Sequence, residues 1–204
     1  MVVLLAAPPG TGKTTLALFL ERLAATVPGM PRVQALGMDG FHYPNAYLDV
    51  HEVVEDGERK TLRSRKGAPF TFDVEALAIA VADLKVARPH PWPAYSRELH
   101  DVVPDAVEIA GEIALVEGNY LLLDELVWRD LAALADCTVF LSAEADMLRE
   151  RLVSRKVAGG MDYAAARAWY EASDGRNVRA VLGAHVPADI ELSLSPDGSI
   201  VFAR

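Results

Sequence analysis

The sequence predicts an α/β fold in which a mostly parallel sheet lies between helices on both of its faces. Short, continuously apolar runs alternate along the chain with segments of helical periodicity, and a glycine-rich turn joins the first run to the first helix. Runs that are apolar throughout suit strands that are buried on both faces. At 204 residues and 51% hydrophobic content, the chain can bury a full core, and we expect one domain over residues 1–204.

The first part of the chain supplies two strands and a helix. Residues 2–6 predict a buried strand, and residues 15–25 predict a helix because their leucines and Phe19 recur at helical spacing. Residues 33–38 predict a second strand. The polar residues 39–72 show little periodicity, so we expect them to form a long loop or an insertion, which is more often functional than not.

The middle of the chain begins with a capped helix. Asp73 is placed to cap a helix over residues 74–86, and the prolines that follow predict an extended connection. Residues 107–110 and 112–116 flank Gly111. They predict a hairpin whose second arm continues as a buried strand.

The last part of the chain continues the alternation of helices and strands. Helices are predicted over residues 124–135, 143–157 and 162–172. A buried strand is predicted at residues 138–141. Two late strands, residues 189–194 and 199–202, are expected to be joined by a tight turn at Pro196-Asp197-Gly198.

Composition and charge exclude several classes of protein. A net charge of −9 argues against a nucleic-acid partner, because binding to a phosphate backbone requires a basic surface. No apolar run approaches the roughly 18 to 20 residues that span a membrane, and residues 1–7 lack the basic start of a secretory signal. The single cysteine, Cys137, cannot form an intramolecular disulfide. We therefore expect a cytoplasmic protein with neither a membrane nor a nucleic-acid partner.

A phosphate-binding motif follows the first predicted strand. Its residues are Pro9, Gly10, Thr11, Gly12, Lys13, Thr14 and Thr15. In a P-loop of this kind, glycines let backbone N–H groups converge on phosphate oxygens, a lysine reaches the terminal phosphates, and a hydroxyl binds Mg²⁺. Lys13 and Thr14 supply the lysine and the hydroxyl. The motif therefore predicts a binding site for ATP and Mg²⁺.

One position departs from the full P-loop pattern, since Ala7 stands where the first glycine is expected. The departure puts the tightness of the first turn in question and leaves the lysine and the hydroxyl in place. A plain glycine-rich turn between a strand and a helix is one alternative. A Rossmann dinucleotide loop fits less well, because Thr15 occupies the position of its third glycine.

Two acidic residues follow predicted strands. Asp39 comes directly after residues 33–38, and Glu117 comes directly after residues 113–116. Doubly wound folds bind their ligands at the carboxyl ends of strands. A carboxylate there can accept the proton of an attacking hydroxyl, which is the role predicted for Asp39, and Glu117 is predicted to bind Mg²⁺ together with Thr14. The alternatives are an ordinary Asp-Gly turn and a solvated glutamate at the end of a strand.

With these motifs in order, the sequence resembles the superfamily of P-loop kinases that contains uridine kinase, phosphoribulokinase and pantothenate kinase. Residues 39–45, Asp-Gly-Phe-His-Tyr-Pro-Asn, are similar to a run in bacterial pantothenate kinases, and residues 65–69 continue the likeness. Residues 65–73, 117–120 and 174–177 resemble an uncharacterised branch known as fructose-transport kinases. The resemblance covers most of the chain. It implies a three-layer P-loop NTPase fold with a helical lid at about residues 149–180.

The resemblance implies residues for an acceptor site and agrees with no single substrate. Tyr95 and His100 fall where uridine kinases carry a tyrosine and a histidine that contact the nucleoside, but Ser96 replaces an aspartate of those enzymes. Arg97 stands where pantothenate kinases have a substrate-binding histidine. The resemblance thus implies that Asp39, Tyr95, Arg97 and His100 contact the acceptor. An ordinary surface histidine is the alternative at position 100.

Two arginines lie where this superfamily has its lid. Arg151 and Arg155 are four residues apart and share one face of the helix predicted at residues 143–157. Lid arginines neutralise charge on the transferring phosphoryl group. By this resemblance Arg155 is a catalytic residue alongside Lys13, and Arg151 is an ATP ligand. The alternative is a solvated, charged helix face.

Together these patterns predict an ATP-dependent kinase that phosphorylates a hydroxyl group of a small molecule, with a nucleoside or sugar favoured and pantothenate second. A non-catalytic nucleotide-binding regulator and a hydrolytic NTPase are the alternatives. The sequence is compatible with a homodimer and does not fix the oligomeric state.

Overall fold

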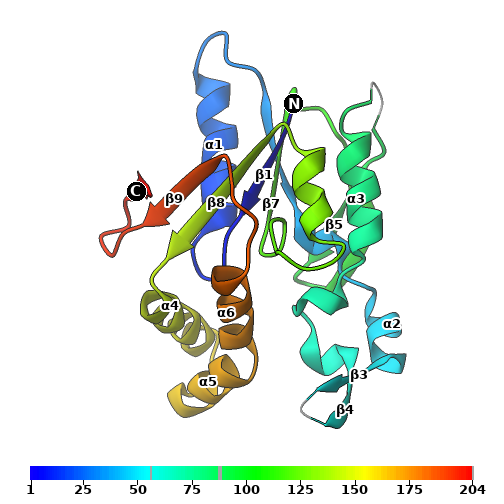
Figure 1. Cartoon of the computed structure of the whole chain (residues 1–204), viewed down its shortest axis with the longest axis vertical. Coiled ribbons are helices and arrows are strands. Elements are labelled where there is room, and N and C mark those ends of the chain that lie inside the picture. Colours follow the sequence, from blue (N-terminus) through cyan, green and yellow to red (C-terminus); the bar gives the residue numbers. More distant parts are fainter. Residues whose placement is uncertain (56, 87–88, 204) are drawn as a thin grey trace.

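One six-stranded sheet organises this computed structural model, which describes residues 1–55, 57–86 and 89–203. From one edge to the other the strands are β10 (Ile200–Phe202), β9 (Ile190–Leu194), β8 (Cys137–Ala143), β1 (Val2–Ala6), β7 (Ile113–Gly118) and β2 (Val33–Gly37). Neighbouring strands are parallel except β10, which is antiparallel to β9. The predicted, mostly parallel α/β fold is therefore confirmed (Figure 1).

Alternate residues of β1 point to opposite faces of the sheet, and because these residues are apolar, helices cover both faces. Leu4 belongs to a core formed with α3 (Val74–Asp83) on one face. Leu5 belongs to a second core, formed with α1 (Lys13–Thr26) and α4 (Ala145–Ala158) on the other. Both residues are almost completely buried. This arrangement gives the three layers that were expected.

Residues 39–72 contain regular structure, so the prediction of a long loop was wrong. They include the hairpin of β3 (Glu52–Glu55) and β4 (Glu58–Thr61). The segment also includes α2 (Asn45–Val50), most of the 3₁₀ turn η1 (Met38–Phe41), and the 3₁₀ turns η2 (Leu62–Arg65) and η3 (Pro69–Thr71). Each of these elements is shorter than the window over which periodicity can be recognised.

The hairpin predicted around Gly111 was also wrong. Strand β6 (Asp101–Val107) pairs antiparallel with β5 (Trp92–Ser96), whereas β7 runs parallel between β1 and β2. The backbone N–H of Gly111 donates a 2.8 Å hydrogen bond to Oε1 of Gln34, on β2. Gly111 therefore lies where the chain enters the sheet at β7. The two-stranded β5–β6 ribbon packs beside β2 and η1.

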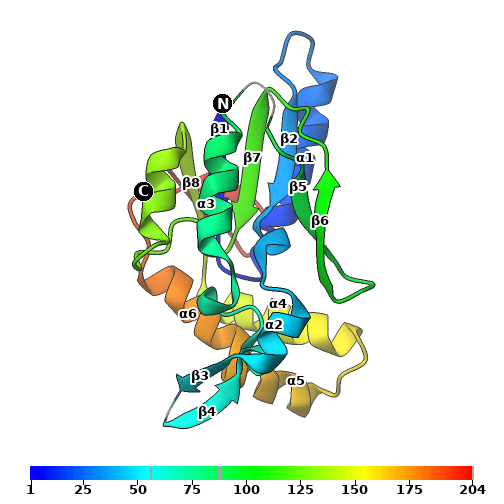
Figure 2. The same ribbon diagram turned by 90° about the vertical axis from the view of Figure 1, so that its right-hand side faces the viewer.

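The helices of the second half are confirmed in part. Residues 124–135 hold only the 3₁₀ segment η4 (Arg129–Leu134), so the regular helix predicted there was wrong. Beyond α4, the helix predicted at residues 162–172 continues as α5 (Tyr163–Trp169), the π-helical turn η5 (Tyr170–Asp174) and α6 (Gly175–Gly183). Figures 1 and 2 show α4, α5 and α6 beyond the carboxyl ends of the parallel strands. The β3–β4 hairpin lies at the same end of the molecule. No helix in the described part of the chain is long and apolar enough to cross a lipid bilayer.

Candidate active site

The P-loop joins the end of β1 to the start of α1. Gly10 and Gly12 have φ angles of 91° and 89°, which residues other than glycine rarely adopt. Thr11 Oγ1 donates a 2.9 Å hydrogen bond to the carbonyl of Pro8 and closes the loop on itself. Ala7 is fully buried and does not have a positive φ, so this turn does not require the missing glycine.

Lys13 and Thr14 begin α1 and face the carboxylate of Glu117 at the end of β7. Thr14 Oγ1 donates a 2.8 Å hydrogen bond to Glu117 Oε1. Burial lowers the pKa of Lys13, the charges of Glu117 and Asp39 oppose this shift, and Arg155 adds to it. Burial raises the pKa of Glu117, and Lys13 and the Thr14 hydrogen bond oppose that shift. The two predicted carboxylates and the two predicted cations thus share one electrostatic environment.

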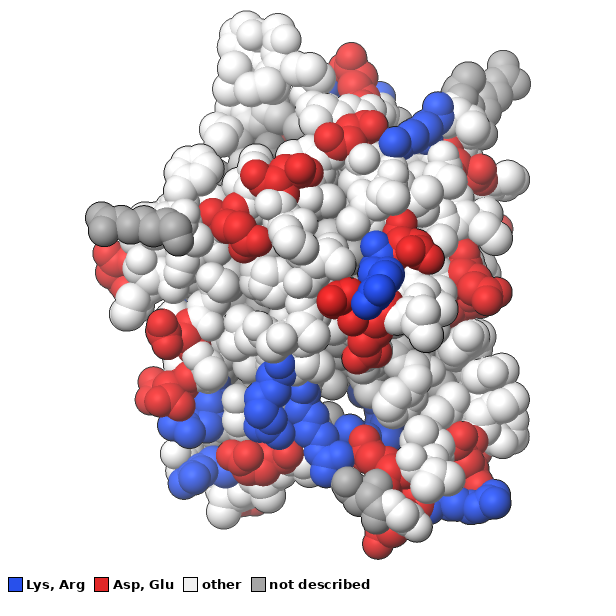
Figure 3. All heavy atoms as spheres, viewed as in Figure 1, with Lys and Arg blue, Asp and Glu red and all other residues white. Residues whose placement is uncertain are grey.

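A cavity of about 250 Å³ lies over the P-loop. Besides the loop residues, three arginines line it: Arg97 from the turn after β5, and Arg151 and Arg155 from α4. Arg151 Nη1 donates to the carbonyls of Gly10 and Thr11 at 3.3 and 3.4 Å. Figure 3 shows a group of Lys and Arg side chains over α4–α6, on a face that also carries many acidic and a few other basic side chains. A concentration of cations on an acidic protein suits a local site for phosphate.

A second cavity, of about 180 Å³, surrounds Asp39 at the end of β2. Thr14, Tyr95, Arg97 and Glu117 also line it. The structure therefore brings together both predicted acids, the P-loop hydroxyl and three of the four predicted acceptor residues, of which Asp39 is one. Asp39 itself is exposed, as a group that must meet a ligand needs to be.

Close packing between η1 and β5 builds this second cavity. A side chain at Gly40 would collide with the backbone carbonyl of Pro93, so the glycine next to Asp39 permits the contact. Trp92 Nε1 donates a 2.9 Å hydrogen bond to the carbonyl of Gly37. These two contacts hold β5 against the end of β2 and explain why Tyr95 lies near Asp39.

His100 lies apart from the other predicted acceptor residues. It occupies an exposed turn between β5 and β6, with φ at 52°. Its backbone carbonyl accepts hydrogen bonds from Asn45 Nδ2 and Lys66 Nζ, both at 3.0 Å. The residues that line the cavity around Asp39 do not include His100. A contact between its ring and the acceptor stays a prediction.

Two polar residues to which the sequence assigned no role have a buried oxygen without a partner. Asn119 Oδ1, directly after β7, and Asp174 Oδ2, in the π-helical turn, accept no hydrogen bond from any described residue. Burial raises the pKa of Asp174, and the charges of Lys156 and Arg155 oppose this shift. Buried polar atoms normally have partners, and π-helical turns are frequent at functional sites. The only signal in the sequence was that both residues lie in runs that carry the family resemblance.

The oxygen atoms beside the P-loop fit a magnesium ion. Mg²⁺ prefers hard oxygen ligands and is usually held by one or two protein groups together with phosphates and water. The hydrogen bond between Thr14 and Glu117 shows that their oxygens are already adjacent at the edge of the phosphate cavity. Among the residues described, no group of three or more His, Cys, Asp or Glu side chains could hold a metal alone.

Comparison with known proteins agrees with this geometry. The chain is 44% identical to YggC of Escherichia coli, an uncharacterized protein, over 98% of this chain and 81% of YggC. It is 33% identical to a candidate uridine kinase of Schizosaccharomyces pombe, over 77% of this chain and 66% of that protein. It is 31% identical to the pantothenate kinase of Rhizobium meliloti over 76% of this chain, but spans only 46% of that enzyme. No protein-family model matches the chain.

A solved structure shows the same relationship. A candidate fructose transport system kinase from Silicibacter sp. TM1040 superposes with a TM-score of 0.84 at 34% identity. The match covers 94% of this chain and 88% of that one. The chain belongs to the superfamily of P-loop kinases that contains the uridine kinases and the pantothenate kinases.

Proposed function

We propose that this protein is an ATP-dependent kinase that transfers the γ-phosphoryl group of ATP to a hydroxyl group of a small molecule. The observation that carries the proposal is that two neighbouring cavities have lining residues in common. Thr14 and Arg97 line both the cavity over the P-loop and the cavity around Asp39. A phosphoryl group in the first cavity would face an acceptor in the second, as direct in-line transfer requires.

A third cavity supports ATP as the donor. It measures about 390 Å³ and shares Gly12, Thr15 and Arg151 with the phosphate cavity. Phe19 and Ile200 contribute apolar walls and are 56% and 38% exposed. A nucleotide base placed there would cover this apolar surface while its phosphates extended over the P-loop.

The residues of the site have separate tasks in this reaction. Asp39 accepts the proton of the acceptor hydroxyl while the oxygen of that hydroxyl forms a bond to the γ-phosphorus. At the same time, the bond between the γ-phosphorus and the bridging oxygen breaks, and ADP leaves with that oxygen. Lys13 and Arg155 neutralise charge on the transferring group. Mg²⁺, held by Thr14 and Glu117, would neutralise charge on the phosphates.

The unpartnered oxygens support an acceptor with several hydroxyl groups. Asp39 lines the acceptor cavity, and the buried Asn119 Oδ1 and Asp174 Oδ2, which do not line it, are also hydrogen-bond acceptors, so a ligand that reached all three would have to donate. Nucleosides and sugars present several hydroxyl donors. Pantothenate presents fewer hydroxyl groups. We therefore place a nucleoside or sugar first and pantothenate second.

The test is ADP release in the presence of uridine, cytidine, pantothenate, fructose, ribose and ribulose 5-phosphate, with Lys13→Ala as the blank. We expect release that depends on one acceptor and matches the phosphorylated product mole for mole by ³¹P NMR. Release that is independent of every acceptor would show a hydrolytic NTPase. ATP binding without release would show a nucleotide-binding regulator.

A further inference from the structure

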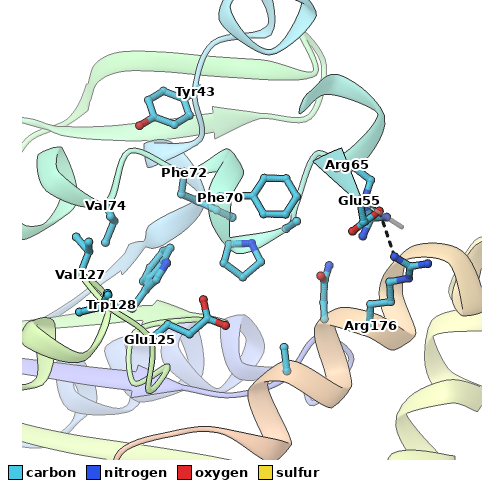
Figure 4. A pocket seen from close by; sticks show the side chains of 15 residues that line it. Tyr43, Glu55, Arg65, Phe70, Phe72, Val74, Glu125, Val127, Trp128 and Arg176 are labelled. Atoms are coloured by element: carbon cyan, nitrogen blue, oxygen red, sulfur yellow. Dashed lines mark ion pairs between the residues drawn. The ribbon is translucent and has the colours of Figure 1, made fainter. Parts of the chain in front are cut away.

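A cavity of about 470 Å³ lies outside the kinase site. It is bounded by residues 65–72, by the loop at residues 125–128 and by α6, as Figure 4 shows. It shares no lining residue with the cavities at the P-loop and at Asp39. Its volume falls within the range of pockets that bind small molecules.

Apolar residues, four of them aromatic, make up most of the lining of this cavity. Phe72 and Trp128 are buried, with 3% and 4% of their surface exposed. At the rim, Phe70 is 41% exposed and Leu126 is 85% exposed. Exposed apolar side chains that cluster around a cavity commonly mark a binding site, because a ligand there removes them from water.

The loop that forms one side of the cavity has an unusual backbone. Val127 has a φ of 77°, in a region that β-branched residues hardly ever occupy. Strain of this kind persists only where the surrounding structure holds it, and it concentrates at ligand-binding segments. The strained residue lies between the exposed Leu126 and the buried Trp128, and all three line the cavity.

The polar groups of the cavity favour a ligand that donates hydrogen bonds. Glu125 is exposed, and Figure 4 shows its carboxylate turned toward the interior of the ring of lining side chains. Asn177 Nδ2 donates to the carbonyl of Gly67 at 3.2 Å, which leaves its Oδ1 as an acceptor. At the other end, Glu55 already holds Arg65 and Arg176 at 2.9 and 3.1 Å.

We propose that this cavity binds a small organic ammonium, a molecule with one protonated amine on an apolar ring or branched body. The ammonium group donates to Glu125 and to Asn177 Oδ1. The apolar body lies against the aromatic walls, whose ring faces also attract cations. The net charge of −9 favours the approach of cations over anions.

The proposal is tested with three probes of matched shape and different charge: 2-phenylethylamine, 2-phenylethanol and phenylacetate. Each is titrated into the intact protein at neutral pH and followed by NMR or calorimetry, with and without ATP·Mg²⁺. We expect saturable binding of the amine that is at least about tenfold tighter than that of the other two probes. We also expect ATP·Mg²⁺ not to displace the amine, because the two sites share no lining residue.

Two variants locate the bound amine. Glu125→Gln should weaken it by about tenfold, since the change removes the charge and keeps the shape. Glu108→Gln, an exposed glutamate elsewhere on the chain, is the matched control and should leave binding unchanged. The proposal is overturned if the amine does not saturate the protein, if the three probes bind equally, if Glu125→Gln has no effect, or if ATP·Mg²⁺ displaces the amine.

Discussion

Thr14 and Glu117 are 103 positions apart in sequence and are joined by a 2.8 Å hydrogen bond from Thr14 Oγ1 to Glu117 Oε1. The contact exists because β1 and β7 are parallel neighbours in register, with Leu5 opposite Glu117. A short P-loop then returns the chain to the same sheet edge at Thr14. The bond therefore reports on both the fold and the site, and it lies at the boundary between the phosphate and acceptor cavities.

Lys13→Ala is expected to abolish phosphoryl transfer and to weaken ATP binding by at least about tenfold, because it removes the P-loop cation from the phosphates. Isothermal titration with ATP·Mg²⁺ and a turnover assay measure the two effects. Lys85→Ala is the matched control, since Lys85 pairs at 3.0 Å with Asp136, away from the P-loop. Unchanged affinity together with unchanged turnover in Lys13→Ala would refute the assignment of the nucleotide site.

Asp39→Asn is expected to lower turnover by roughly 10² to 10⁴ while ATP affinity stays within a few fold. The substitution keeps the shape of the side chain and removes the group that accepts the proton. Steady-state kinetics and ATP titration on the same preparation separate chemistry from binding. A variant with wild-type turnover would make Asp39 an ordinary turn residue.

Glu117→Gln is expected to stabilise the protein in the absence of nucleotide, although it should impair Mg²⁺-dependent turnover. A raised pKa means that the folded state binds a proton at Glu117 more tightly than the unfolded state, whose pKa is near 4.5. The cost of ionisation is therefore absent at pH values below 4.5, grows as the pH rises through the folded pKa, and is complete above it. Glutamine removes this cost.

Urea unfolding followed by circular dichroism, at mildly alkaline pH and again in acid, checks the effect of Glu117→Gln. The variant should have the higher unfolding midpoint at alkaline pH, and the difference should shrink in acid. A variant that is less stable than the wild type at alkaline pH would mean that the attraction between Glu117 and Lys13 outweighs burial.

Asp174→Asn is expected to raise the KM for the acceptor by about tenfold and to leave the KM for ATP unchanged. The buried Oδ2 of Asp174 lacks a partner in the described structure, so we expect it to accept a hydrogen bond from a hydroxyl group of the acceptor. The substitution replaces this charged carboxylate with a neutral amide and so weakens that bond. Asp146→Asn, an exposed aspartate on α4 paired with Arg149, is the control. A rise in the KM for ATP instead would show that Asp174 acts on the phosphates through Arg155.

Arg97→Ala is expected to lower kcat/KM for the best acceptor more than His100→Ala does. Arg97 lines both cavities, whereas His100 occupies an exposed turn and is held by its backbone carbonyl. Both variants are assayed against the same acceptor panel. A larger loss in His100→Ala would show that the turn moves onto the acceptor, and would support the contact that the sequence predicted.

The parts of the fold that the sequence predicted best are those with strong local signals. Residues 2–6 are apolar throughout, and α3 follows its Asp73 cap, whose carboxylate accepts from the backbone of Ala76 at 2.9 Å. Asp39 and Glu117 could be placed near each other because each follows a strand, and parallel strands end at one edge of a sheet.

The features that were missed depend on contacts between distant segments. Gly111 resembles a hairpin turn locally, and only its bond to Gln34 shows that the chain enters the sheet there. Helix α6 follows a π-helical turn, which shifts the helical period and hides the continuation of the helix beyond residue 172. The buried oxygens of Asn119 and Asp174 became recognisable only once burial was known.

Trp92 gives the acceptor cavity an optical signature. Its indole is bonded to the carbonyl of Gly37, is only 2% exposed, and lines the same cavity as Asp39. Ultraviolet excitation of this rigid, water-poor indole produces short-wavelength emission, whereas Trp169, at 45% exposure, emits further to the red. In a Trp128→Phe variant, which lacks the other buried indole, a titration of the blue edge of the spectrum therefore reads out acceptor entry without a label and without catalysis.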